Sequence, residues 1–185
     1  MGGLLPVANV LGRLMMLFSL SYVVPIAGSI LYLDGMAADF VLGMVITLAV
    51  GAALFLATRS HYRELKVRDG FLLVTSSWVI MGAIAAVPLM LVYPQIGFTN
   101  ALFETLSAMT TTGGTVLAGL DYAPQSVNLW RHLLQWLGGL GIIVLAVAIL
   151  PLLGVGGMQL YRAEMPGPMK EARITARIAD TAKAL

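Results

Sequence analysis

Six consecutive residues, Thr110-Thr111-Thr112-Gly113-Gly114-Thr115, offer many oxygen ligands and carry no formal charge. Backbone carbonyl oxygens replace the hydration shell of a dehydrated cation in ion-selective filters, and hydroxyl oxygens can either join them or support the loop from behind. Glycine adopts positive φ without steric penalty, so Gly113 and Gly114 allow successive carbonyls to turn to one side. The stretch is therefore either a cation-binding loop or an ordinary polar surface loop.

The sequence holds few residues for other kinds of chemistry. Cysteine is absent, which excludes disulfides and Cys-ligated metal sites within the chain. The only imidazoles are those of His61 and His132, and neither an HExxH nor a P-loop sequence occurs. The net charge of +2 is too small to indicate nucleic-acid binding. We expect a protein that is not an enzyme and needs no cofactor.

The composition is that of an integral membrane protein. Hydrophobic residues make up 59% of the chain and charged residues only 11%, against about 25% in soluble domains. Uncharged stretches cover Leu14–Leu33 and Phe40–Thr58. Each is close to the roughly 20 residues that a helix needs to cross a bilayer. We predict an all-α fold that begins with a two-helix hairpin, and Pro25 is expected to kink the first helix.

The elements on either side of the threonine-rich loop differ in length. A helix over Phe71–Leu91 is expected to end near Tyr93, because Pro94 and Gly97 interrupt the apolar run. A short helix, N-capped by Thr99 or Asn100, is expected to continue to Thr110. It is too short to span a bilayer and is typical of a re-entrant segment. If this helix enters the membrane from outside, its C-terminal end, which is the negative end of the helix dipole, points at the loop.

A last apolar span is predicted over Leu133–Gly157. Trp130 and Trp136 at its entry suit an interfacial aromatic belt. The closely spaced glycines Gly138, Gly139 and Gly141 favour close helix packing.

Glu104 lies midway along the short helix, where a carboxylate is costly and usually functional. It either attracts cations to a pore mouth or supports the loop by hydrogen bonds, unless it simply faces external water. Arg131 and His132 are interpreted as interfacial anchors.

The distribution of basic residues predicts the orientation. Ten of the 11 Lys and Arg residues lie in segments assigned to the cytoplasmic side, and Arg131 is the exception. Because cytoplasmic segments carry the excess of Lys and Arg, both ends of this chain are expected in the cytoplasm. The basic segment after Gly157 then suits either a docking surface or a contact with anionic lipid.

Long motifs resemble those of a known family. Phe103–Gly113 (FETLSAMTTTG) and Leu134–Val144 (LQWLGGLGIIV) closely resemble the Trk/Ktr potassium-transporter family. Leu152–Glu164 (LLGVGGMQLYRAE) resembles its TrkH-type membrane subunits in particular, and the likeness extends to Lys66–Phe71. The resemblance implies four fused helix–pore loop–helix repeats around one pore, often preceded by a hairpin.

The resemblance divides the chain into three parts. Residues 1–62 correspond to the hairpin, residues 63–158 to the first repeat with its pore helix and filter near 99–116, and residues 159–185 to a cytoplasmic connector toward a second repeat. It implies a filter strand formed by Thr111, Thr112, Gly113, Gly114 and Thr115. The bound ion would be potassium at Thr111, Thr112 and Gly113, with Thr110 and Glu104 in support.

The implied function is potassium uptake across the bacterial inner membrane. The implied partners are the lipid bilayer, the remaining repeats, a cytoplasmic nucleotide-binding regulatory subunit and a second copy in a homodimer. The chain departs from the family in carrying one of four filter strands and stopping where a second repeat would begin. Two alternatives therefore stay open, namely a subunit of a homotetrameric cation channel and a membrane assembly module that transports nothing.

Overall fold

The computed structural model describes residues 4–60 and 67–149, and every regular element in them is helical. Within these residues, three helices are long and apolar enough to cross a membrane, at Leu4–Tyr32, Ala37–Thr58 and Arg68–Val92. The predicted span over Leu133–Gly157 and the predicted connector over residues 159–185 lie partly or wholly outside the described residues. In order, the elements are α1 (Leu4–Ser19), η1 (Leu20–Tyr22), α2 (Val23–Tyr32), α3 (Ala37–Thr58), α4 (Val67–Val92), α5 (Gly97–Met109), η2 (Leu120–Tyr122) and α6 (Gln125–Ile149).

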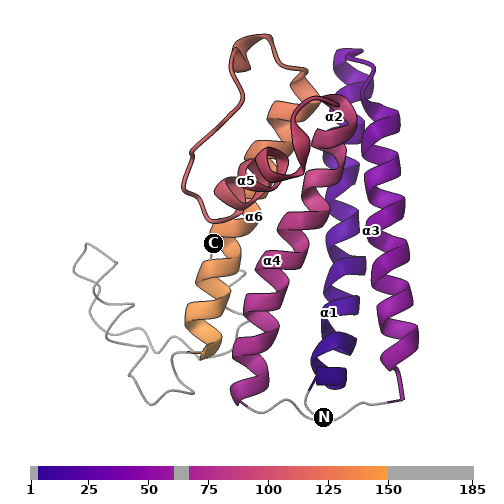
Figure 1. Ribbon diagram of the computed structural model, residues 1–185, viewed down its shortest axis with the longest axis vertical. Coiled ribbons are helices and arrows are strands. Elements are labelled where there is room, and N and C mark those ends of the chain that lie inside the picture. Colours follow the sequence, from indigo (N-terminus) through magenta and orange to yellow (C-terminus); the bar gives the residue numbers. More distant parts are fainter. Residues whose placement is uncertain (1–3, 61–66, 150–185) are drawn as a thin grey trace, which may run out of the picture. The chain divides into compact units, whose positions relative to one another are not determined.

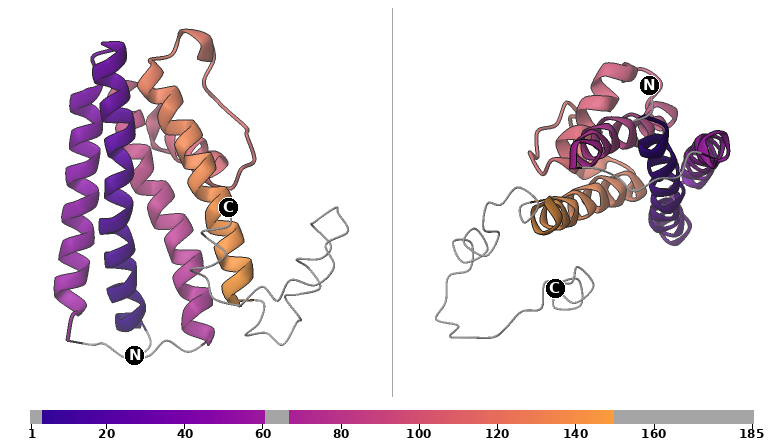
Figure 2. Two further views of the ribbon diagram at one scale, coloured as in Figure 1. Left: turned by 180° about the vertical axis from the view of Figure 1, so that it is seen from behind. Right: turned by 90° about the horizontal axis from the view of Figure 1, so that it is seen from below.

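The chain separates into two compact units after Gly139. The first unit holds α1 to α5 and the beginning of α6, and the second begins at Leu140 within α6. In the first unit α1 packs against both α3 and α4, and short α5 lies across α4 (Figure 1; seen from behind and below in Figure 2). All the contacts discussed below belong to this first unit.

The first membrane helix begins earlier than predicted. It starts at Leu4 rather than Leu14, and Arg13 lies inside it. The Arg13 guanidinium carbon lies 5.1 Å from the centre of the Phe55 ring, a cation–π contact that gives the charge a partner within the helical segment. The expected interruption near Pro25 is present, because the 3₁₀ turn η1 separates α1 from α2 just before it. Proline removes a helical hydrogen bond and its ring crowds the preceding turn.

The hairpin helices approach each other at a pair of glycines. A Cβ on Gly12 would lie 2.8 Å from the Gly51 carbonyl oxygen, and a Cβ on Gly51 would lie 2.9 Å from the Gly12 carbonyl oxygen. Small residues allow backbones in membrane helices to pack this closely. Beside this contact, the buried Asn9 amide donates to the Thr58 hydroxyl across 3.3 Å. These contacts join α1 to α3.

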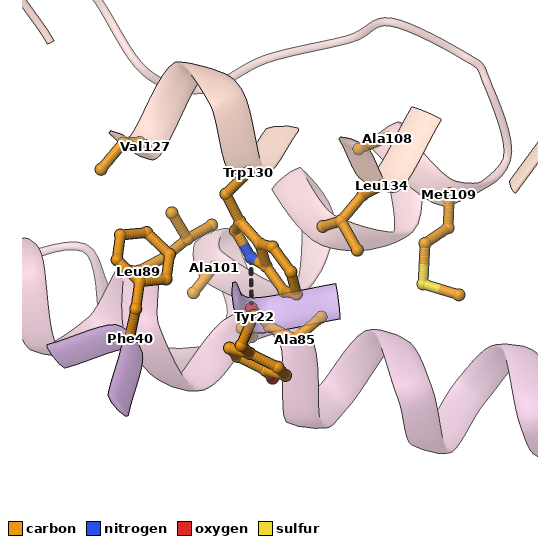
Figure 3. Packing of buried hydrophobic residues seen from close by; sticks show 11 residues of the cluster. Tyr22, Phe40, Ala85, Leu89, Ala101, Ala108, Met109, Val127, Trp130 and Leu134 are labelled. Atoms are coloured by element: carbon orange, nitrogen blue, oxygen red, sulfur yellow. Dashed lines mark hydrogen bonds between the residues drawn. The ribbon is translucent and has the colours of Figure 1, made fainter. Parts of the chain in front are cut away.

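An aromatic cluster joins the hairpin to α4 and α6 (Figure 3). Trp130 is fully buried, its ring centre lies 4.4 Å from that of Tyr22, and its indole N–H donates to the Ala85 carbonyl across 3.2 Å. Phe40 lies against the same ring at 6.1 Å. The prediction that Trp130 belongs to an interfacial belt is therefore wrong, because its polar N–H finds a partner inside the protein. Trp136 is exposed, at 63%.

A polar contact also links the hairpin to α6. The Asp34 carboxylate accepts the Ser126 N–H, at the start of α6, across 2.8 Å, and it also accepts the Ser29 hydroxyl. Partial burial acts to raise the pKa of Asp34, but these bonds and one from the Met36 N–H hold that pKa below its usual value. Asp34 thus acts as an N-terminal cap supplied from a distant part of the chain.

The helices around the loop largely match the prediction. The helix α4 ends at Val92, one residue before Tyr93, and α5 has 13 residues. The predicted N-cap at Thr99 or Asn100 is wrong, because α5 begins at Gly97, which has a φ of 70°. The chain makes its turn at this glycine, which adopts positive φ without a steric penalty, and α5 therefore starts two residues before Thr99.

Candidate functional site

The threonine-rich loop begins in a strained turn at the end of α5. The Thr111 N–H donates to the Ala108 carbonyl (3.0 Å) and the Thr112 N–H to the Ser107 carbonyl (2.9 Å). These two bonds form a Schellman motif, whose left-handed position is usually glycine. Thr111 occupies that position with a φ of 56°. Left-handed geometry costs a residue with a Cβ about 1–2 kcal/mol, and strain of this kind gathers at functional sites.

The two glycines of the loop have different roles. Gly113 has a φ of 77°, as the sequence predicted, and a Cβ there would meet no atom within 4 Å. Gly114 is not in the positive-φ region. Its carbonyl accepts the Ser107 hydroxyl at 2.7 Å, and a Cβ would lie 3.3 Å from the Phe103 ring. Gly113 therefore permits a backbone conformation, whereas Gly114 permits a close approach to α5.

Three consecutive carbonyls remain available for an ion. Thr111, Thr112 and Gly113 are exposed, and among the described residues nothing donates a hydrogen bond to their carbonyl oxygens. The neighbouring oxygens are engaged instead. The Thr110 hydroxyl donates to the Leu106 carbonyl and lies 2.8 Å from the Thr112 hydroxyl oxygen. The structure thus divides the predicted ligand set into free carbonyls at 111–113 and engaged groups on either side.

Glu104 is the centre of the contacts that hold the far end of the loop. Its side chain is buried, and Oε1 accepts the Thr115 hydroxyl (2.6 Å), the Val116 N–H and the Leu117 N–H (3.2 Å). Oε2 accepts the Arg131 Nε–H across 3.2 Å. Of the alternatives for Glu104, exposure to external water is wrong, and the geometry is that of a support for the loop. The Thr115 hydroxyl therefore bonds to the Glu104 carboxylate.

The beginning of α6 packs against the end of α5. A Cβ on Gly138 would lie 1.8 Å from the Met109 carbonyl oxygen, closer than any real contact. The next glycine, Gly139, has more space, with the Thr111 methyl as the nearest group at 4.0 Å. The predicted packing role is confirmed for Gly138. The contact places α6 against Met109, the residue that immediately precedes the loop.

Arg131 is the main residue for which the sequence-based prediction is wrong. The prediction makes it an interfacial anchor, but its side chain is only 11% exposed and points at Glu104. A signal was present in the sequence. Between Gly70 and Gly157 the charged residues are Glu104, Asp121 and Arg131, and a buried carboxylate needs a cationic partner. His132, beside it, is exposed and contacts the Asn128 carbonyl.

The sequence profile of the TrkH family, described as cation transport protein, matches residues 36–185. This chain belongs to the TrkH family. The Trk system potassium uptake protein TrkH of Halomonas elongata is 49% identical over 180 residues, which cover 97% of this chain and 37% of that protein. For TrkH of Escherichia coli K12 the identity is 47% with the same coverage, and for TrkG of that organism it is 39%.

A solved structure shows the same fold. The crystal structure of the potassium transporter TrkH from Vibrio parahaemolyticus aligns with a TM-score of 0.80 and 43% sequence identity, covering 98% of this chain and 36% of that one. The all-helical membrane fold and the resemblance to TrkH-type subunits are thereby confirmed. The chain spans a little over a third of the length of these TrkH-family relatives.

Proposed function

We propose that this chain is the N-terminal part of a potassium-uptake subunit and that its loop supplies one strand of a selectivity filter. The observation that carries the proposal is the run of three free carbonyls at residues 111–113, held between engaged groups on both sides. Such carbonyls can replace the hydration shell of potassium. Thr110 and Glu104 support the strand, and Gly114 and Thr115 fix its outer half to α5.

One strand cannot surround an ion. A dehydrated cation left partly unligated in a medium of low dielectric constant carries a large desolvation cost. The remaining strands must come from further repeats or from further copies of this chain. The match to about a third of each relative favours further repeats over a homotetramer, because a hairpin and one of four repeats together make up about that share. We call this chain together with those repeats the complete transporter.

The position of Arg131 strengthens the proposed orientation. Ten of the 11 basic residues fall on one side of the predicted spans, and the exception is paired with buried Glu104 rather than placed in a loop. We infer a subunit of the bacterial inner membrane, with both ends of this chain cytoplasmic and with the predicted division into residues 1–62, 63–158 and 159–185. A regulatory nucleotide-binding subunit and a second copy are its proposed partners.

Labelling of introduced cysteines tests this orientation without background, because the chain has no native cysteine. An impermeant reagent added outside intact cells is expected to modify Asp121→Cys and to leave Lys170→Cys unmodified. Labelling of Lys170→Cys from outside would overturn the orientation.

A matched pair of glycine substitutions tests the filter assignment. Gly113 and Gly35 have nearly the same φ, 77° and 80°, and at both positions a Cβ meets no atom within 4 Å. Alanine therefore imposes the same local strain at each, of about 1 kcal/mol. In the complete transporter, Gly113→Ala is expected to lower potassium uptake or its discrimination against sodium, and Gly35→Ala is not. Equal behaviour of the two variants would remove the loop from the ion pathway.

A further inference from the structure

Two residues of α5 hold the loop, and they lie one helical turn apart. Ser107 contacts residues 112–114 through its carbonyl and hydroxyl, and Glu104 contacts residues 115–117 through Oε1. Residues three apart share one face of a helix. The loop therefore runs back along a single face of α5, from Ser107 to Glu104. The directions of the free carbonyls at 111–113 depend on the positions of both attachments.

The first attachment is local, whereas the second depends on another helix. Ser107 lies in the last turns of α5 and bonds to residues that follow it directly. Glu104 has one oxygen for the loop and the other for Arg131 of α6, 27 residues away. The carboxylate is 0% exposed and the guanidinium side chain 11% exposed. A carboxylate buried to this degree needs a charged partner, because removal of the partner leaves an uncompensated buried charge.

We propose that Arg131 is a positioning residue for ion selection: by fixing Glu104, it sets the outer end of the loop and hence the directions of the carbonyls at 111–113. This inference rests on the proposed function. Arg131 acts through Glu104 and does not touch the ion. The pair also transmits any movement of the first half of α6 to the loop, since it joins the two.

A rival role for Glu104 is attraction of cations by its charge. The geometry opposes that role, because both carboxylate oxygens are occupied and the guanidinium compensates the charge at 3.2 Å. Asp121 is the contrasting case, an exposed carboxylate in the connection between α5 and α6. The Asp121→Asn variant therefore removes an exposed charge of the same sign while leaving the support of the loop intact.

The test compares charge-neutral variants in the complete transporter. Potassium uptake is measured against a series of sodium concentrations to give a potassium-to-sodium selectivity ratio, and the amount of protein in the membrane is measured in parallel. The set is Glu104→Gln, Arg131→Gln, the double variant, Arg131→Lys and the control Asp121→Asn. Gly113→Ala is included to test the filter assignment separately.

We expect Glu104→Gln and Arg131→Gln each to lower the selectivity ratio by about tenfold or more, equivalent to about 1.4 kcal/mol of discrimination. The double variant is expected to be no worse than either single variant, because both changes break the same link. Arg131→Lys keeps the charge and is expected to recover part of the ratio. Asp121→Asn should leave it unchanged.

Three results would overturn the inference. They are an unchanged selectivity ratio in both single variants, a loss in the double variant equal to the product of the single losses, or a loss in Asp121→Asn of similar size. If Arg131→Gln yields no protein in the membrane, Arg131→Lys decides, because it keeps the charge and removes the Nε–H that Glu104 Oε2 accepts. An unchanged ratio there contradicts the inference, and a lowered ratio supports it. If Gly113→Ala changes the ratio and these variants do not, only the positioning role fails; if Gly113→Ala has no effect, the proposed function fails.

Discussion

Replacing Gly138 with alanine perturbs the contact between α5 and α6 directly. The added methyl group would lie 1.8 Å from the Met109 carbonyl oxygen, 2.6 Å from its carbonyl carbon and 2.9 Å from its Cα. Normal non-bonded contacts lie near 3.5 Å, so one backbone must move by about 1.7 Å. Neither side offers a flexible side chain that can rotate away. We expect a loss of stability at the upper end of the range for overpacking, about 3 kcal/mol.

The neighbouring glycine supplies the control. A Cβ on Gly139 would have the Thr111 methyl as its nearest atom, at 4.0 Å, which is an ordinary contact. Alanine is a better helix former than glycine by about 1 kcal/mol. Gly139→Ala is therefore expected to be neutral or slightly stabilising. Of two adjacent substitutions of the same kind in α6, only Gly138→Ala should lower the free energy of unfolding.

The assay is the unfolding midpoint of the complete transporter in detergent, together with potassium uptake and its sodium sensitivity. Gly138→Ala should lower the midpoint and weaken discrimination, because the displaced Met109 carbonyl immediately precedes the loop. Equal midpoints for Gly138→Ala and Gly139→Ala would refute the packing argument. A lowered midpoint with intact discrimination would confirm the contact but separate it from the geometry of the loop.

Two further outcomes follow from the described contacts. Asp34→Asn should destabilise by about 1 kcal/mol, as loss of an N-terminal cap does. Because the pKa of Asp34 is lowered in the folded protein, this stabilisation is present above the unfolded pKa of about 3.9 and is lost as the pH falls through the folded pKa. The unfolding midpoints of the unsubstituted protein and of Asp34→Asn should therefore converge as the pH is lowered through these values. Thr111→Gly should relieve left-handed strain of about 1 kcal/mol while weakening potassium discrimination. Leu33 has the same φ of 56°, so Leu33→Gly should raise the unfolding midpoint by a similar amount and leave potassium discrimination unchanged. Lowered discrimination in both variants would contradict a role specific to the loop.

Features set by local backbone chemistry could be predicted from the sequence. The end of α4 near Tyr93 follows from Pro94, which disfavours helical geometry in the residue before it. The shortness of α5 and the positive φ of Gly113 follow from the spacing of turn residues and from the freedom of glycine. These features need no knowledge of distant partners.

Features that depend on residues distant in the sequence could not be predicted from the local sequence. The sequence predicts an interfacial position for Trp130, because its contacts with Tyr22 and Ala85 come from other helices and cannot be inferred from the local sequence. The sequence likewise places Arg13 at the edge of a span, because the Phe55 ring that contacts its guanidinium belongs to another helix. A charge or an indole N–H in an apolar segment is costly only when it is unpaired, and pairing is a tertiary property.

The division of labour within the loop also required tertiary contacts. Thr111 and Thr115 are the same residue type, yet Thr111 carries the first of the free carbonyls at a strained turn and Thr115 donates its hydroxyl to Glu104. Charge counting alone could have paired Glu104 with Arg131, since Arg131 is the one basic residue between Arg68 and Arg162. Charge counting could not have shown that one carboxylate oxygen bonds to the loop and the other to Arg131.

The central claim is that the carbonyls of Thr111, Thr112 and Gly113 bind the transported ion. It is tested most directly by the anomalous diffraction signal of rubidium, a potassium substitute, in crystals of the complete transporter. We expect rubidium density in contact with these three carbonyl oxygens, and we expect it to weaken in the Gly113→Ala variant but not in Gly35→Ala. Rubidium density confined to other positions, with these carbonyls turned away from it, would contradict the claim.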